Sequence, residues 1–98
     1  EYEQNIKNLI KKYNLTENFI FRGTTNEVYK ELINSSIFAF PSIDEGFGLA
    51  LGEAMATGLP CIGLVNCPSV NTLIKHNQNG LLCNNNPYEF SQALRKLM

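Results

Sequence analysis

Residues 37–65 read IFAFPSIDEGFGLALGEAMATGLPCIGLV and contain the strongest structural pattern in the chain. The first four residues form a continuous apolar run that Pro41 stops, and residues 61–65 form a second apolar run. Between them a glycine-rich loop leads into a helical stretch over about 48–57, which Gly58 ends. Two strands that are apolar on both faces, joined through a loop and a helix, predict a parallel sheet covered by helices.

The sequence before this stretch continues the alternation. Apolar residues spaced i, i+3, i+4, i+7 predict a helix over about 2–13. A β-favouring run at 19–22, ended by Gly23, predicts a strand. Thr25 or Asn26 is expected to cap a second helix. The residues of that helix expected to face inward are Val28, Tyr29, Leu32 and Ile33.

The sequence after residue 65 repeats the same units. A short helix is expected at about 69–76, a brief strand at 80–83 and a last helix from about Pro87, whose ring suits a first helical turn. The predicted fold class is therefore α/β, a Rossmann-like three-layer α/β/α arrangement around a parallel sheet. We expect one partial domain over residues 1–98.

Composition limits the classes of function. The chain has 98 residues, of which 44% are hydrophobic and 17% charged, values typical of a globular domain. A net charge of -1 without a basic patch argues against nucleic acid as a partner. No apolar run is long enough to span a bilayer, and no signal peptide is recognisable, so we expect a cytoplasmic protein. Peripheral membrane contact of a longer protein stays open.

Three cysteines occur without CxxC spacing. An odd number of cysteines in this arrangement argues against a disulfide framework or a structural zinc site. We expect three reduced thiols, and one of them, Cys67, could border a ligand pocket because it follows the strand at 61–65. The single histidine, His76, is expected to interact with a helix dipole. The aromatic residues expected in the core are Tyr29, Phe38, Phe40 and Phe90.

The loop between the two apolar strands carries the residues best suited to ligand binding. Gly46 and Gly48 allow a sharp turn and a close approach of a ligand. The first N–H groups of the following helix have no partner within the helix, and together with the helix dipole they form an anion site. Glu45 precedes the helix and Glu53 lies about one turn inside it, and carboxylates accept hydrogen bonds from sugar hydroxyls. This combination predicts a site for a sugar joined to a phosphate.

A simpler interpretation of the same residues is also open. Acidic side chains near a helix N-terminus are favourable for the dipole alone. A Gly-x-Gly pattern after a strand is a weak signal by itself. The residues around the loop decide between the two interpretations.

The wider pattern resembles the donor-domain signature of the retaining family 4 glycosyltransferases of GT-B fold. Glu45 and Glu53 match the E-x7-E pair of that family, within EGFGL, EAMA and GLP. Residues 19–23, FIFRG, resemble its F-x-G strand and turn. Residues 38–42, FAFPS, resemble its strand before the acidic loop, and residues 79–82, NGLL, its late turn. The resemblance covers nearly the whole chain in the same order.

This resemblance implies a role for each loop residue. Glu45 would contact the transferred sugar and stabilise charge near its anomeric carbon, which makes it the candidate catalytic residue. Glu53 would hold the ribose hydroxyls. The other donor-binding candidates are Gly46, the amides of Phe47 and Gly48 at the sugar, those of Leu49 and Ala50 at the diphosphate, and Thr24 and Thr25 near the base. The resemblance implies no metal and no cofactor, since the nucleotide sugar is a substrate.

The resemblance also implies partners outside the chain. A saccharide or lipid acceptor, as in polysaccharide biosynthesis, would be held by an N-terminal domain. The sheet order of the family, 3-2-1-4-5-6, includes two strands that precede residue 1. Without them, either 19–22 pairs with 37–40, or a gap stays open, or a second copy fills the gap in a dimer. We expect the 98-residue chain alone to be inactive.

Other classes of function remain as alternatives. A non-catalytic binding or interaction module on a Rossmann-like fold is the main one, because a fold does not fix a function. Such a module has no need for an acidic pair at a helix start. A sugar epimerase or phosphorylase of the same architecture is a third class, although no lysine is a convincing partner for pyridoxal phosphate. A glycoside hydrolase would need its two carboxylates on opposite sides of the scissile bond.

Overall fold

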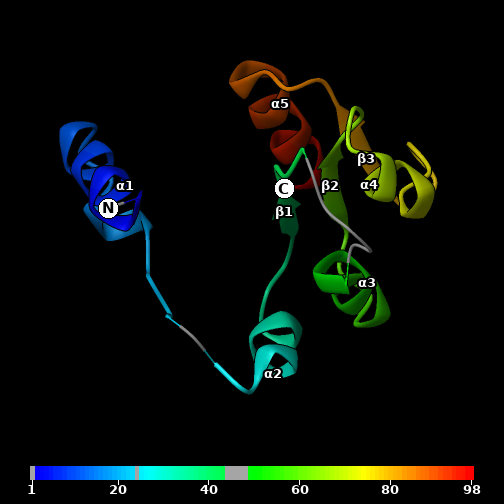
Figure 1. Ribbon diagram of the computed structural model, residues 1–98, viewed down its shortest axis with the longest axis horizontal. Coiled ribbons are helices and arrows are strands. Elements are labelled where there is room, and N and C mark those ends of the chain that lie inside the picture. The colour runs from blue at the N-terminus through cyan, green and yellow to red at the C-terminus, as the bar shows by residue number, and fades with distance from the viewer. Residues whose placement is uncertain (1, 24, 44–48) are drawn as a thin grey trace.

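Three parallel strands form the centre of the structure (Figure 1). The computed structural model describes residues 2–23, 25–43 and 49–98. The strands are β1 (Phe38–Phe40), β2 (Cys61–Leu64) and β3 (Gly80–Cys83), and they lie in the order β1-β2-β3. Each strand agrees with its predicted run to within a residue.

Helices precede, connect and follow the strands, as predicted. They are α1 (Tyr2–Lys12), a 3₁₀ turn η1 (Thr16–Asn18), α2 (Val28–Ile33), α3 (Leu49–Ala56), α4 (Pro68–Leu73) and α5 (Pro87–Leu97). Because α3 joins β1 to β2 and α4 joins β2 to β3, the chain uses the strand–helix–strand unit that parallel sheets require.

Each face of the sheet has its own hydrophobic core. On one face, Cys61 of β2 packs with Leu51 of α3 and Val70 of α4. On the other face, Ile62 packs with Ala93 of α5. Consecutive residues of β2 therefore point to opposite covered faces, which explains why this strand is apolar throughout and buried at every position. The three-layer α/β/α prediction is confirmed.

Residues near the helix ends determine where α3 and α5 stop and start. After α3, Gly58 adopts a φ of 83°, its N–H donates to the Met55 carbonyl, and the N–H of Leu59 donates to the Ala54 carbonyl. This is the double hydrogen-bond pattern of a glycine-ended helix. Before α5, the Asn86 side chain accepts a hydrogen bond from the N–H of Glu89 at 3.0 Å.

The predicted strand at 19–22 is wrong. The structure has no strand there, and Ile20 is 74% exposed. Within the described residues β1 pairs with β2 alone, so of the three arrangements considered, the gap beside β1 is open in this structure. A β-favouring segment becomes a strand only when another strand accepts and donates its backbone hydrogen bonds, and among the described residues this segment pairs with no strand.

The inward faces predicted for the first two helices are mostly exposed. In α2 only Leu32 reaches the core, whereas Tyr29 is 66% exposed and so is not the core residue that we expected. In α1 the only buried residue of the apolar stripe is Ile10. Figure 1 shows α1 standing away from the sheet, so its amphipathic pattern has no matching surface among the described elements.

Candidate functional site

The candidate site lies where the carboxyl ends of the strands meet. All three strands are parallel, so β1, β2 and β3 end at the same edge of the sheet. In open α/β sheets this edge is where ligands bind. The connection from β1 to α3, which contains the predicted donor loop, leaves the sheet here.

The first turn of α3 contains backbone donors that have no acceptor within the helix. Leu49 begins the helix and is 73% exposed, and Ala50 is exposed beside it. Their N–H groups belong to the first turn, where no carbonyl of the helix can accept from them. This end of α3 is therefore open to solvent and carries the positive end of the helix dipole. The geometry suits an anionic ligand.

Glu53 lies on the exposed side of the same helix. Leu51 and Ala54 point into the core and are fully buried, which fixes the rotation of α3 about its axis. Leu49 and Glu53 are four residues apart, so they share one face, and both are exposed. The carboxylate therefore projects from the solvent side of α3, one turn beyond the unpaired amides.

The loop after β2 forms the next part of this edge. Phe40 of β1 is paired with Gly63 of β2 in the register of the sheet. The connection that starts at Pro41 and the loop after Leu64 therefore leave the sheet at the same edge. Cys67, which we expected near a ligand pocket, is fully buried in the core and does not border the edge directly.

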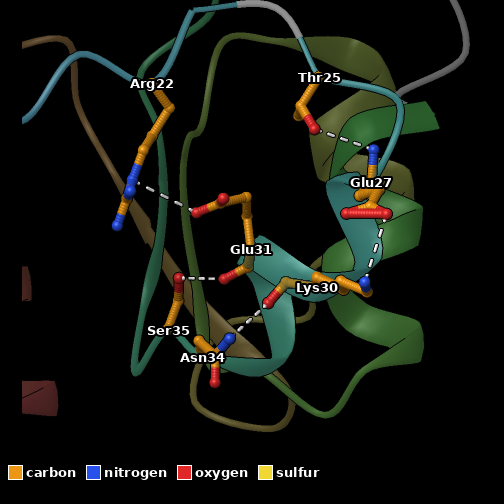
Figure 2. A network of polar contacts seen from close by, with 7 residues as sticks. All are labelled: Arg22, Thr25, Glu27, Lys30, Glu31, Asn34 and Ser35. Atoms are coloured by element: carbon orange, nitrogen blue, oxygen red, sulfur yellow. Dashed lines mark hydrogen bonds and ion pairs between the residues drawn. The ribbon is translucent and has the colours of Figure 1, made fainter.

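Thr25, a predicted neighbour of the base, belongs to the turn before α2. Its hydroxyl oxygen accepts a hydrogen bond from the N–H of Glu27 at 2.9 Å (Figure 2). Figure 2 also shows Arg22 next to Glu31, with 3.5 Å between the guanidinium Nε and a carboxylate oxygen. Both charged side chains are well exposed, so this ion pair contributes little to stability. It does link the segment after α1 to α2.

Several candidate residues cannot be located relative to these features. Thr24, Glu45, Gly46, Phe47 and Gly48 lie outside the described residues. The structure therefore brings together Leu49, Ala50 and Glu53 from the predicted set. It does not bring Thr25 to them through any described contact.

Sequence reasoning missed a hollow between β3 and α5 that has both apolar and polar lining residues. Its polar lining includes His76, Glu89, Gln92 and Lys96, with Cys83 at the end of β3. His76 Nδ1 accepts a hydrogen bond from the N–H of Leu82 at 2.9 Å, which requires that nitrogen to be unprotonated. The histidine thus covers a backbone donor of β3 instead of serving as the expected partner of a helix dipole.

The three cysteines are unpaired thiols, as expected. Burial raises the pKa of the Cys61 thiol. Burial, and to a smaller degree the negative charge of Glu89, raise the pKa of the Cys83 thiol. Both thiols are therefore protonated near neutral pH and are poor nucleophiles. Within the described ranges, no group of three or more His, Cys, Asp or Glu side chains is arranged to hold a metal ion.

Comparison with known proteins matches this architecture to one family. The family model "Glycosyl transferases group 1" matches residues 1–98, the full length of the chain. The chain belongs to this family.

Individual relatives support the same assignment. This group 1 chain is 40% identical over 89 residues, 91% of its length, to an uncharacterized glycosyltransferase of Haemophilus influenzae. It is 36% identical over 78 residues to the N-acetyl-alpha-D-glucosaminyl L-malate synthase of Bacillus anthracis, a match that covers 80% of the chain. It is 39% identical over 69 residues to the UDP-Gal:alpha-D-GlcNAc-diphosphoundecaprenol alpha-1,3-galactosyltransferase of Escherichia coli, covering 70% of the chain. The matches span 25%, 20% and 18% of those three relatives, respectively.

The helices of this group 1 chain are short. Among the residues that the structure describes, none is long and apolar enough to cross a membrane.

Proposed function

We propose that this chain is the donor-binding domain of a retaining family 4 glycosyltransferase of GT-B type. The full-length enzyme would transfer a sugar from a nucleotide sugar to a saccharide or lipid acceptor. The observation that carries the proposal is the start of α3. There, the first-turn amides and the exposed carboxylate of Glu53 follow the connection that begins at the carboxyl end of β1, on the edge where open α/β sheets bind ligands.

The first-turn amides of α3 and the carboxylate of Glu53 suit different parts of a nucleotide sugar. The amides of Leu49 and Ala50 can donate to diphosphate oxygens, with the helix dipole adding to the attraction. Glu53 can accept from the two ribose hydroxyls, since a carboxylate has two oxygens and this residue is exposed. Glu53 lies one turn of the helix beyond these amides. In a nucleoside diphosphate the ribose is likewise attached next to the phosphates.

Glu45 and the loop glycines complete the proposed site on the sugar side. Glu45 precedes the helix, so it would lie beyond the phosphates, toward the anomeric carbon. A carboxylate there can stabilise positive charge that develops on the sugar as the bond to the diphosphate breaks. Gly46, Phe47 and Gly48 would contact the sugar through their backbone, and Thr24 and Thr25 would lie near the base.

Two relatives support the substrate class. The name of the E. coli relative states a UDP-linked galactose as donor and a lipid diphosphate as acceptor. The name of the B. anthracis relative states that it synthesises N-acetyl-alpha-D-glucosaminyl L-malate. We propose the same general use of a nucleotide sugar here, without a metal or a cofactor. The three unpaired thiols fit a reducing compartment, the cytoplasm.

The experiment that tests the proposal replaces Glu53 in the full-length protein. Loss of a charged hydrogen-bond acceptor typically costs about 1.5–3 kcal/mol, so Glu53→Ala should weaken binding of the nucleoside diphosphate by at least about tenfold. Binding is measured by calorimetry with UDP and GDP. The matched control is Glu17→Ala, another exposed glutamate, on η1, which should leave the dissociation constant unchanged. Equal affinity of the Glu53 variant and wild type would contradict the ribose role.

A second measurement separates an enzyme from a binding module. The full-length protein is incubated with nucleotide sugars and acceptors, and release of nucleoside diphosphate is followed. Turnover supports a transferase, whereas tight nucleotide binding without turnover would favour the non-catalytic module. The 98-residue chain by itself should give no turnover, because no acceptor is positioned in line with the donor.

A further inference from the structure

The loop between β2 and α4, residues 65–67, is held by hydrogen bonds at both ends. The N–H of Val65 donates to the Cys83 carbonyl at 2.9 Å, and the Val65 carbonyl accepts from the side-chain amide of Asn71. The N–H of Cys67 donates to the Leu64 carbonyl at 3.2 Å, and the Cys67 carbonyl accepts from the N–H of Asn71 at 3.0 Å. Asn71 therefore fixes both ends of the loop, one with its side chain and one with its backbone.

Packing reinforces these hydrogen bonds. The Cys67 side chain is fully buried in the core beside Val70. Pro68 begins α4 immediately afterwards, and its ring restricts the backbone there. The loop can therefore change its shape only by disturbing the core. It has the rigidity that a substrate-contacting loop needs for discrimination.

Asn66 is the residue that this rigid loop presents to solvent. It lies between the two anchored residues and is exposed. Its side chain forms no hydrogen bond with the other residues that the structure describes. An asparagine amide offers donors and an acceptor together, the combination that suits the hydroxyl groups of a neutral sugar. It carries no charge with which to bind a diphosphate.

The order of the strands places Asn66 at the carboxyl edge of the sheet, next to the end of β1. Phe40, the last residue of β1, pairs with Gly63 of β2, so these two adjacent parallel strands end at the same edge of the sheet. Neighbouring strands are about 4.8 Å apart. Asn66 comes two residues after the end of β2, which lies beside β1 in the sheet. The connection from β1 to α3 begins at the same edge.

We propose that Asn66 contacts the hydroxyls of the transferred sugar and helps to select it, and that Asn71 is the positioning residue that holds Asn66 in place. This inference rests on the proposed function, because it needs a nucleotide sugar at the start of α3. The ligand group is a neutral hexosyl unit with epimeric hydroxyls. Asn66 favours the epimer whose hydroxyl can form a hydrogen bond with its side-chain amide. The other epimer leaves a donor or acceptor without a partner in a closed site, which is unfavourable.

The test uses the full-length protein and a panel of UDP- and GDP-linked hexoses that includes epimeric pairs such as UDP-glucose and UDP-galactose. Asn66→Ala should lower kcat/KM for the preferred donor by about tenfold. It should also reduce the preference between epimers by a similar factor. The affinity for the bare nucleoside diphosphate should change by less than about twofold. Asn8→Ala, on exposed α1, is the matched control and should change none of these values.

The positioning role of Asn71 is tested by whether a change at Asn71 alters the epimer preference in the same way as a change at Asn66. Asn71→Asp keeps the size of the side chain but cannot donate to the Val65 carbonyl, and it should reproduce the loss of epimer preference seen with Asn66→Ala. The double variant should lose little more than either single variant, since both changes remove the same contact. A merely structural role would instead lower the thermal midpoint and weaken bare nucleotide binding together. An unchanged epimer preference in Asn66→Ala, which is at an exposed position and should fold, would overturn the proposal.

The outcomes also separate this inference from the proposed function. If the nucleoside diphosphate binds in a Glu53-dependent manner but Asn66→Ala behaves like wild type, only the role of Asn66 is refuted. If no nucleotide binds at all, the proposed function fails and the role of Asn66 fails with it.

Discussion

Replacing Gly63 by alanine tests the packing that supports the candidate site. A methyl group added at Gly63 would overlap Val70 Cγ1 and lie 3.3 Å from Ile74 Cδ1. Val70 and Ile74 are almost completely buried, so neither side chain can rotate away without disturbing the core. Overpacking of this kind typically costs about 1–3 kcal/mol. The free energy of unfolding of Gly63→Ala should fall by about that amount.

A second substitution shows whether the clash has the stated cause. Val70→Ala removes the obstructing methyl groups and by itself costs about 1.6 kcal/mol or more, at about 0.8 kcal/mol per buried methylene plus a cavity term. In the double variant the new methyl group enters the vacated space. The two changes should therefore be non-additive, with a favourable coupling of about 0.5–3 kcal/mol.

The assay is urea unfolding followed by circular dichroism. The control is Gly52→Ala in α3, where an added methyl group has no atom within 4 Å. A helical alanine in place of glycine should raise stability by about 0.5–1 kcal/mol. If Gly63→Ala were tolerated as well as Gly52→Ala, or if the double variant were simply additive, α4 would not pack on β2 as described.

Three further predictions concern the site, a helix cap and a buried thiol. Glu45→Gln in the full-length protein should reduce turnover while leaving nucleoside diphosphate affinity nearly intact. Normal turnover with collapsed affinity would mean that the roles of the two glutamates are reversed. Asn86→Ala should lower the free energy of unfolding by about 0.5–2 kcal/mol, because the N–H of Glu89 loses its acceptor. Asn86→Asp, which keeps an acceptor, should restore most of it. Burial raises the pKa of the Cys61 thiol above its ordinary value of 9.0, so the unfolded chain loses this proton first. The free energy of unfolding should then fall as the pH rises through 9, and Cys61→Ala should flatten that part of the pH profile.

The sequence predicted the part of the fold that is complete within the chain. β2 is buried on both faces and bounded by Pro60 and the loop after Leu64, so its apolar run has one interpretation. α3 ends at Gly58 because a left-handed backbone conformation is needed there. These features are local, and each can be recognised without knowing its tertiary partner.

The errors share a different physical cause. The run at 19–22 has the composition of a strand, but a strand exists only when a neighbour pairs with it. In the same way, the stripe on α1 indicates that an apolar partner is needed and does not say whether the chain supplies it. Tyr29 was misassigned for this reason. Periodicity reports which face is apolar, and exposure depends on what lies opposite.

Side-chain contacts to the backbone were also beyond sequence reasoning. His76 accepts from the N–H of Leu82, and Asn71 donates to the Val65 carbonyl, in each case six residues apart. No helical or strand periodicity marks such a spacing, because it depends on how the loop folds back on the sheet. The candidate donor residues came instead from motif spacing, and the structure locates Leu49, Ala50 and Glu53 on one exposed end of α3.

The most direct test of the central claim is hydrogen–deuterium exchange of the full-length protein with and without a saturating nucleotide sugar. The proposed site predicts protection over residues 41–53, centred on the first turn of α3, with further protection at 65–67. The hollow between β3 and α5, at His76, Glu89 and Lys96, should exchange at the same rate in both states. Protection centred on that hollow, with none at the start of α3, would contradict the account.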